Sequence, residues 1–81
     1  MNDECYILLH IDDAETVDVL LFRSSESAHQ RMELEYHTKA LELIEEGYEC
    51  NTRIDDMTAE ICPINSGIWH KWNIWDAIIA E

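Results

Sequence analysis

The chain has 81 residues, 18 of them acidic and five basic, and its formal net charge is −13. Such a charge excludes nucleic acid and anionic membranes as direct ligands, because both would repel the protein. Acidic chains are often disordered when they lack apolar residues, but 47% of this chain is hydrophobic and three residues are tryptophan. One small folded domain over residues 1–81 is therefore expected.

Cysteine and histidine usage predicts neither a disulfide framework nor a cofactor. Cys5, Cys50 and Cys62 are odd in number and widely spaced. No recognised zinc spacing is present, so no metal site is expected and the histidines are expected at the surface; they are His10, His29, His37 and His70. The first residues lack the basic segment of a signal peptide, and no apolar run reaches the ~18 residues that cross a bilayer, so a cytoplasmic protein is expected.

A hairpin and a long helix are predicted in the first half of the chain. Apolar, strand-forming residues at 5–11 and 17–22 flank a polar turn that contains Asp12 and Asp13. Ser24 offers an N-cap oxygen, helix formers continue to Glu46, and Gly47 can adopt the left-handed conformation that ends a helix. At 100° per residue, one stripe of this helix is apolar and is expected to cover a sheet; it comprises Ala28, Met32, Tyr36, Ala40, Leu43 and Ile44.

Leu34 and Leu41 stand outside that stripe, one heptad apart. They are interpreted as an edge of the core, with a contact to a dimer mate or partner as the alternative.

A second hairpin and a final strand are predicted in the second half. Residues 48–54 and 57–62 alternate between apolar and polar, with an aspartate pair as the turn between them. Residues 63–67 are loop-like in composition, and 68–79 are aromatic and β-branched enough for a strand, although 75–80 could form a helical turn. The fold class is therefore α+β with the order ββαβββ, an antiparallel sheet with one helix on a face.

This topology brings two acidic groups to the same end of the molecule. If the first strand runs upward, the first turn lies at the top, and the helix climbs back to that end. Glutamates at a helix C-terminus oppose the helix dipole, so they are candidates for binding a partner, with a simple solvated helix end as the alternative. The candidate residues are Asp12, Asp13, Glu42, Glu45, Glu46 and Glu49.

The tryptophans add an aromatic candidate. On a strand, Trp69 and Trp75 share one face and Trp72 lies on the other, so at least one indole is expected to be partly exposed if a helix covers a single face. Core packing is the default interpretation. Trp69 is taken as the candidate anchor for a partner, since tryptophan is enriched at such positions.

Charge density links these features to a function. Thirteen net charges equal about 22 Å of duplex DNA, and a domain of this size spans about 30 Å. In size, charge and hairpin–helix–hairpin plan, with the six candidate acids as its basis, the chain resembles small acidic phage-encoded inhibitors of bacterial defence, such as anti-CRISPR and anti-restriction proteins. The resemblance implies an inhibitor in the host cytoplasm that docks on a basic nucleic-acid-binding partner such as a Cas effector.

No phosphate-binding loop, serine elbow or Cys/His nucleophile pattern is present, so a non-enzymatic protein is expected. The alternative function is a small regulatory or structural module that forms a homodimer through its apolar surface. In that case the charge serves only solubility.

Overall fold

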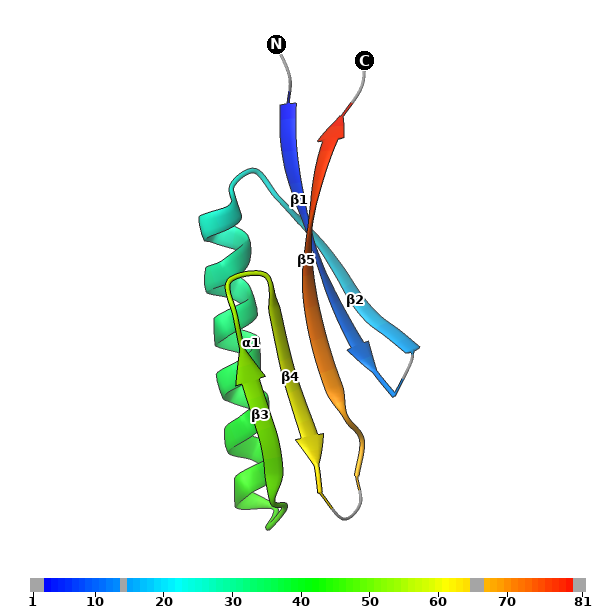
Figure 1. Cartoon of the computed structure of the whole chain (residues 1–81), viewed down its shortest axis with the longest axis vertical. Coiled ribbons are helices and arrows are strands. Elements are labelled where there is room, and N and C mark those ends of the chain that lie inside the picture. Colours follow the sequence, from blue (N-terminus) through cyan, green and yellow to red (C-terminus); the bar gives the residue numbers. More distant parts are fainter. Residues whose placement is uncertain (1–2, 14, 65–66, 80–81) are drawn as a thin grey trace.

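The last strand of the chain joins two hairpins into one sheet (Figure 1). The computed structural model describes residues 3–13, 15–64 and 67–79. Its five strands are antiparallel and lie in the order β2-β1-β5-β4-β3. The elements are β1 (Asp3–Asp12), β2 (Glu15–Phe22), α1 (Ser25–Glu45), β3 (Cys50–Ile54), β4 (Thr58–Pro63) and β5 (His70–Ile79).

The predicted α+β class and the order ββαβββ are confirmed, and the element boundaries differ from the expected ones by two residues or fewer. Pro63, expected in the loop, is the last residue of β4, and residues 65 and 66 of that loop lie outside the described residues. β5 is extended through Ile79, so the alternative of a helical turn from Trp75 is wrong for the described residues.

Local chemistry fixes both ends of α1. The Ser24 hydroxyl accepts a hydrogen bond from the Ser27 N–H at 3.1 Å, which is the expected N-cap. At the other end, Gly47 has φ +92°, its N–H donates to the Ile44 carbonyl, and the Tyr48 N–H donates to the Leu43 carbonyl. This pair of bonds is a Schellman motif, so the predicted stop at Gly47 is confirmed.

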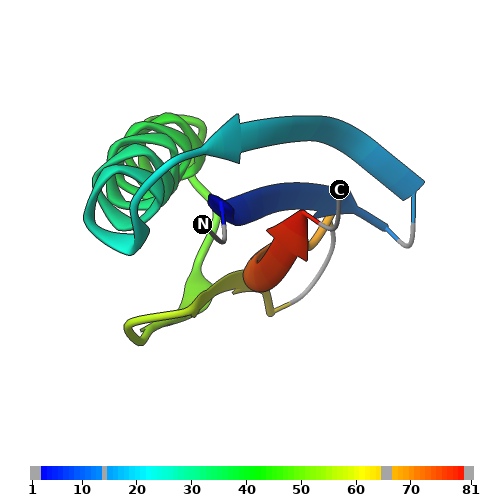
Figure 2. The ribbon, with the colours of Figure 1, turned by 90° about the horizontal axis from the view of Figure 1, so that it is seen from above.

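The helix lies across one face of the sheet (Figure 2). The core forms between them from residues of α1, β1, β4 and β5: Leu8, Ala28, Met32, Tyr36, Leu43, Ala59, Ile61, Trp72 and Ile74. Ala40, expected in the core, is half-buried, and Ile44 is 63% exposed. Ile44 projects 160° from Ala28 at 100° per residue, which is beyond the arc that faces the sheet.

The molecule is longer than its chain length predicts. Its radius of gyration is 14.0 Å and its longest extent is 49 Å, against the expected span of about 30 Å. The cause is the pairing of β1 with β5, which continues past the last pair of β1 with β2, at Tyr6 and Phe22, and past Thr58 at the start of β4 (Figure 1). A two-stranded ribbon therefore extends from the body of the sheet.

Candidate functional site

The predicted convergence of the first turn and the helix end is confirmed for three of the acids. Asp12, Glu42 and Glu46 line one hollow between the end of β1 and the last turns of α1. The hollow has a volume of about 310 Å³, at the lower limit of small-molecule sites. Its other lining residues are Lys39, Leu43, Tyr48, Gly67, Ile68 and His70.

The other candidates lie around this hollow without lining it. Glu45 and Glu49 are exposed near the end of α1. Asp13 is exposed, has φ +49°, and donates its backbone N–H to the carbonyl oxygen of Trp69 at 3.2 Å. The first turn therefore lies beside Trp69, whose side chain is half-buried. We call this end of the molecule, with Asp13, Glu42, Glu45, Glu46 and Glu49, the acidic end.

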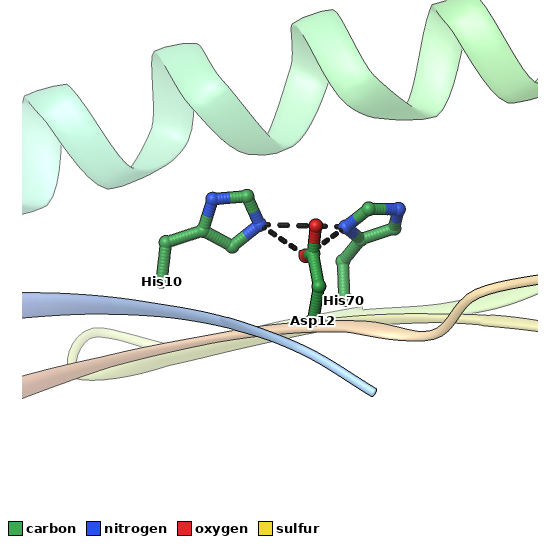
Figure 3. A group of neighbouring side chains, drawn as sticks. All are labelled: His10, Asp12 and His70. Atoms are coloured by element: carbon green, nitrogen blue, oxygen red, sulfur yellow. Dashed lines mark hydrogen bonds and ion pairs between the residues drawn. The ribbon is translucent and has the colours of Figure 1, made fainter. Parts of the chain in front are cut away.

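Asp12 differs from the other acids because it belongs to a buried cluster with two histidines (Figure 3). His10 and Asp12 are two residues apart on β1, so both side chains face the helix, and His70 is the direct partner of Asp12 on β5. His10 Nε2 lies 2.8 Å from Asp12 Oδ1 and 3.3 Å from His70 Nδ1, and His70 Nδ1 also contacts Asp12 Oδ1. Two imidazole nitrogens and one carboxylate oxygen, all atom types that bind metal ions, thus point at one another.

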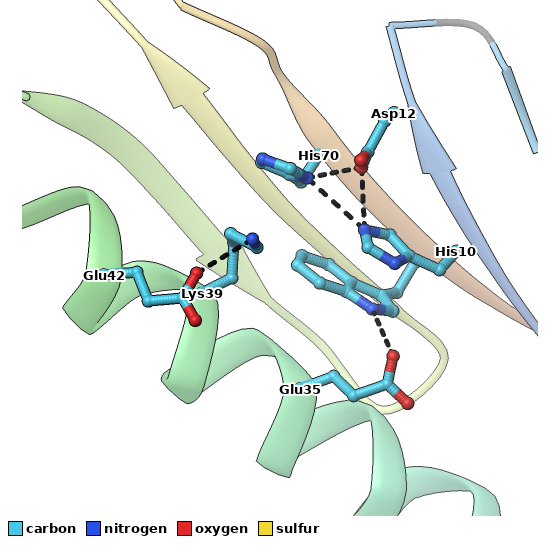
Figure 4. Close-up of polar contacts among 7 residues, drawn as sticks. His10, Asp12, Glu35, Lys39, Glu42 and His70 are labelled. Atoms are coloured by element: carbon cyan, nitrogen blue, oxygen red, sulfur yellow. Dashed lines mark hydrogen bonds and ion pairs between the residues drawn. The ribbon is translucent and has the colours of Figure 1, made fainter. Parts of the chain in front are cut away.

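Trp72 holds the His10 ring of this cluster in place. Figure 4 shows His10 beside Asp12 and His70, with Glu35 on α1. The ring of His10 stacks on the fully buried Trp72 ring, with centroids 4.5 Å apart and planes 9° from parallel. Trp72 Nε1 is 3.4 Å from the Glu35 carboxylate, and Tyr36 packs edge-on against the indole. The orientation of His10 is therefore set by contacts from both the sheet and α1.

Burial lowers the pKa of His10 from its ordinary value, and the neighbouring His70 and Lys39 lower it further. The carboxylates of Asp12 and Glu35 act in the opposite direction but do not reverse the shift. His10 is consequently neutral at neutral pH, so one nitrogen of its ring carries a proton and the other a lone pair.

The expectation of surface histidines is wrong for His10 and His70. His70 is 6% exposed and the His10 side chain 12% exposed, whereas His37 is exposed and His29 half-exposed. Asp12 was predicted in the turn that follows the first strand, and only the extension of β1 to Asp12 places it on the same face as His10. The contribution of His70 could not have been found from the sequence either, because it depends on the register between β1 and β5.

The face of the sheet opposite α1 carries an apolar patch. Ile7 lies opposite Leu21 on β2 and Trp75 on β5, and Leu9 lies opposite Val19. Leu21 is 67% exposed and Trp75 58% exposed. We call these five residues the open sheet face. Trp72 was expected on the opposite face from Trp69 and Trp75, and this is confirmed, since Trp72 is the buried one of the three. Trp69 was the predicted anchor, but Trp75 is the more exposed of the two.

Leu34 and Leu41 are not an edge of the core. They are 60% and 61% exposed and line a hollow along α1 with Gln30, Glu33, His37 and Thr38. Leu34 also lines a second hollow, which reaches His10 and Trp72 on the sheet.

Comparison with protein-family models, with curated proteins and with solved structures finds no match to this chain. Among the described residues, no helix is both long enough and apolar enough to span a membrane.

Proposed function

We propose that this protein is a non-enzymatic inhibitor whose acidic end docks into a basic nucleic-acid-binding groove of a bacterial defence complex, such as a CRISPR-Cas effector. Three unpaired glutamates carry this proposal. Within the described part of the chain, the side chains of Glu45, Glu46 and Glu49 form no ion pair, and the last turn of α1 contains no basic residue. A cluster of uncompensated carboxylates at the negative end of a helix favours a cationic partner.

The basic residues do not interrupt this surface with free positive charge. Arg31 pairs with Glu35 at 2.7 Å, Lys39 with Glu42 at 2.9 Å, and Lys71 with Glu60 at 3.7 Å. Arg53 likewise pairs with Asp55. Four of the five cations are therefore matched locally by a carboxylate, and the net charge is left on the remaining acids.

The shape of the molecule favours mimicry of one strand rather than of a duplex. Thirteen net charges over a longest extent of 49 Å amount to one per roughly 4 Å. Duplex DNA carries one charge per ~1.7 Å of axis, and a single strand one per ~3.4 Å. The linear charge density of the protein is therefore closer to that of a single nucleic-acid strand than to that of a duplex.

Competition with nucleic acid tests this function. A labelled copy of the protein is added to a purified Cas effector, and single-stranded and duplex DNA are added as competitors. We expect competition, and we expect Glu45→Gln/Glu46→Gln to bind at least ~10-fold more weakly. The control Glu26→Gln/Asp56→Asn removes the same charge at the opposite end and should bind normally. Equal weakening by both pairs would show a non-specific charge effect and contradict docking through the acidic end.

The open sheet face supports a second candidate function, a homodimeric interaction module. Its apolar side chains lie away from the acidic end, and the charges on the neighbouring strands of that face are paired, Lys71 with Glu60 and Arg53 with Asp55. Two copies could therefore meet through this face without bringing their acidic ends together. Exposed apolar patches of this kind mark interaction sites in small proteins.

A further inference from the structure

We propose that His10, Asp12 and His70 form a binding site for a divalent transition-metal ion of the zinc type. His10 and Asp12 lie on β1 and His70 on the neighbouring strand β5, and all three side chains face the helix. Their ligand atoms all lie within 4.8 Å of one another (Figure 3). Two imidazoles and one carboxylate are a donor set that zinc and its neighbours in the first transition row accept.

The spacing of the nitrogens fits an ion between them. Zinc–nitrogen bonds are ~2.0–2.1 Å long, so two nitrogens on a tetrahedral ion lie about 3.4 Å apart. His10 Nε2 and His70 Nδ1 are 3.3 Å apart. Asp12 Oδ1 lies closer to both nitrogens, as a hydrogen-bond acceptor does, and would have to withdraw by about half an ångström from His10 Nε2 and further from His70 Nδ1. The two rotatable bonds of the Asp12 side chain allow this movement.

The surroundings hold the His10 ring in one direction and open the cluster to a hollow. The stack of His10 on Trp72 and the bond of Trp72 to Glu35 fix the ring direction, which is the role of outer-shell contacts around metals. Asp12 and His70 also line the hollow of the acidic end, which gives an entry path. Lys39 lines the same hollow, but its charge is matched by Glu42 at 2.9 Å (Figure 4).

Two of the three polar side chains are largely buried, since His70 is 6% and the His10 side chain 12% exposed. A chain of 81 residues has a small hydrophobic core. Apolar side chains at these positions would stabilise that core without the desolvation cost of burying polar groups. Three protein ligands leave a further coordination position for water or for a group on a partner. The site would thus connect the sheet centre to the hollow beside Glu42 and Glu46.

Zinc titration of the full-length, untagged protein after removal of metal by a chelator tests the site. Calorimetry should give one strong site per chain, and cobalt should produce the visible absorption of a tetrahedral complex. His10→Ala or His70→Ala should weaken binding at least ~100-fold, since losing even an outer-shell partner costs roughly 10–100-fold. His37→Ala removes an exposed imidazole and should leave the affinity unchanged.

Nuclear magnetic resonance of the wild-type protein keeps the test independent of whether the variants fold. Zinc should shift the imidazole signals of His10 and His70 and leave those of His29 and His37 in place. Absence of stoichiometric binding, or shifts confined to His29 and His37, would overturn the metal site and leave a purely hydrogen-bonded His–Asp–His cluster. Neither result bears on the docking of the acidic end.

Discussion

Trp72 and Trp75 are three residues apart on β5 and lie in opposite environments. Trp72 is fully buried beneath α1, where its ring contacts His10 and Tyr36. Trp75 is 58% exposed, and its register partner on β1 is Ile7. The same side chain therefore has a structural role at one position and is available for contact at the other.

Truncation should separate these two roles. Trp72→Ala should cost ~3–5 kcal/mol in free energy of unfolding and unfold much of the protein at room temperature, because it opens a cavity in a small core. Trp75→Ala should change that free energy by no more than about 0.5 kcal/mol but weaken a homodimer by ~2 kcal/mol or more. Urea denaturation and sedimentation equilibrium measure the two effects. Retained dimerisation in a folded Trp75→Ala protein would argue against the open sheet face.

The helix α1 places charges unfavourably at its end. Glu26 in the first turn interacts favourably with the positive end of the dipole, whereas Glu45 and the C-cap Glu46 lie at the negative end without a basic neighbour in the last turn. Folding alone does not account for glutamates at these two positions. Binding of a cationic partner would offset this unfavourable placement of charge.

Neutralising these glutamates should move stability and binding in opposite directions. Glu45→Gln/Glu46→Gln removes two like charges from the negative helix end, so the free energy of unfolding should hold or rise by a few tenths of a kcal/mol per site. Glu26→Gln should lower it by a similar amount. Thermal unfolding by circular dichroism compares the three proteins. A clear loss of stability in the double variant would mean that the two glutamates make structural contacts.

The whole molecule has two distinct sides. α1 and the acidic end lie on one side of the sheet, and the apolar open sheet face lies on the other. These two sides predict opposite responses to salt. Carboxylates that dock into a basic groove are screened by ions, whereas two copies of an acidic protein repel one another less when ions are present.

Ionic strength should therefore separate the two candidate functions. As salt rises from 0.1 M to 1 M, the Debye length falls from ~10 Å to ~3 Å, and binding to a basic partner should weaken steeply. Association of the protein with itself should strengthen over the same range. Anisotropy with a labelled protein measures the first and sedimentation the second. A partner affinity unchanged by salt would contradict nucleic-acid mimicry.

The sequence by itself determined the elements and the charge. Strand alternation, the Ser24 cap and the Gly47 stop are local signals, so the boundaries could be predicted to within two residues. The convergence of Glu42 and Glu46 with Asp12 followed from strand and helix directions alone.

Only the tertiary structure determined which residues distant in sequence are neighbours in space. β5 pairs with both β1 and β4, and this places His70 against Asp12 and Trp75 against Ile7. Residues 58 positions apart meet here through strand register, and no periodicity within either strand encodes that register. The helix then buries one sheet face, which encloses the His10–Asp12–His70 cluster and leaves the open sheet face exposed.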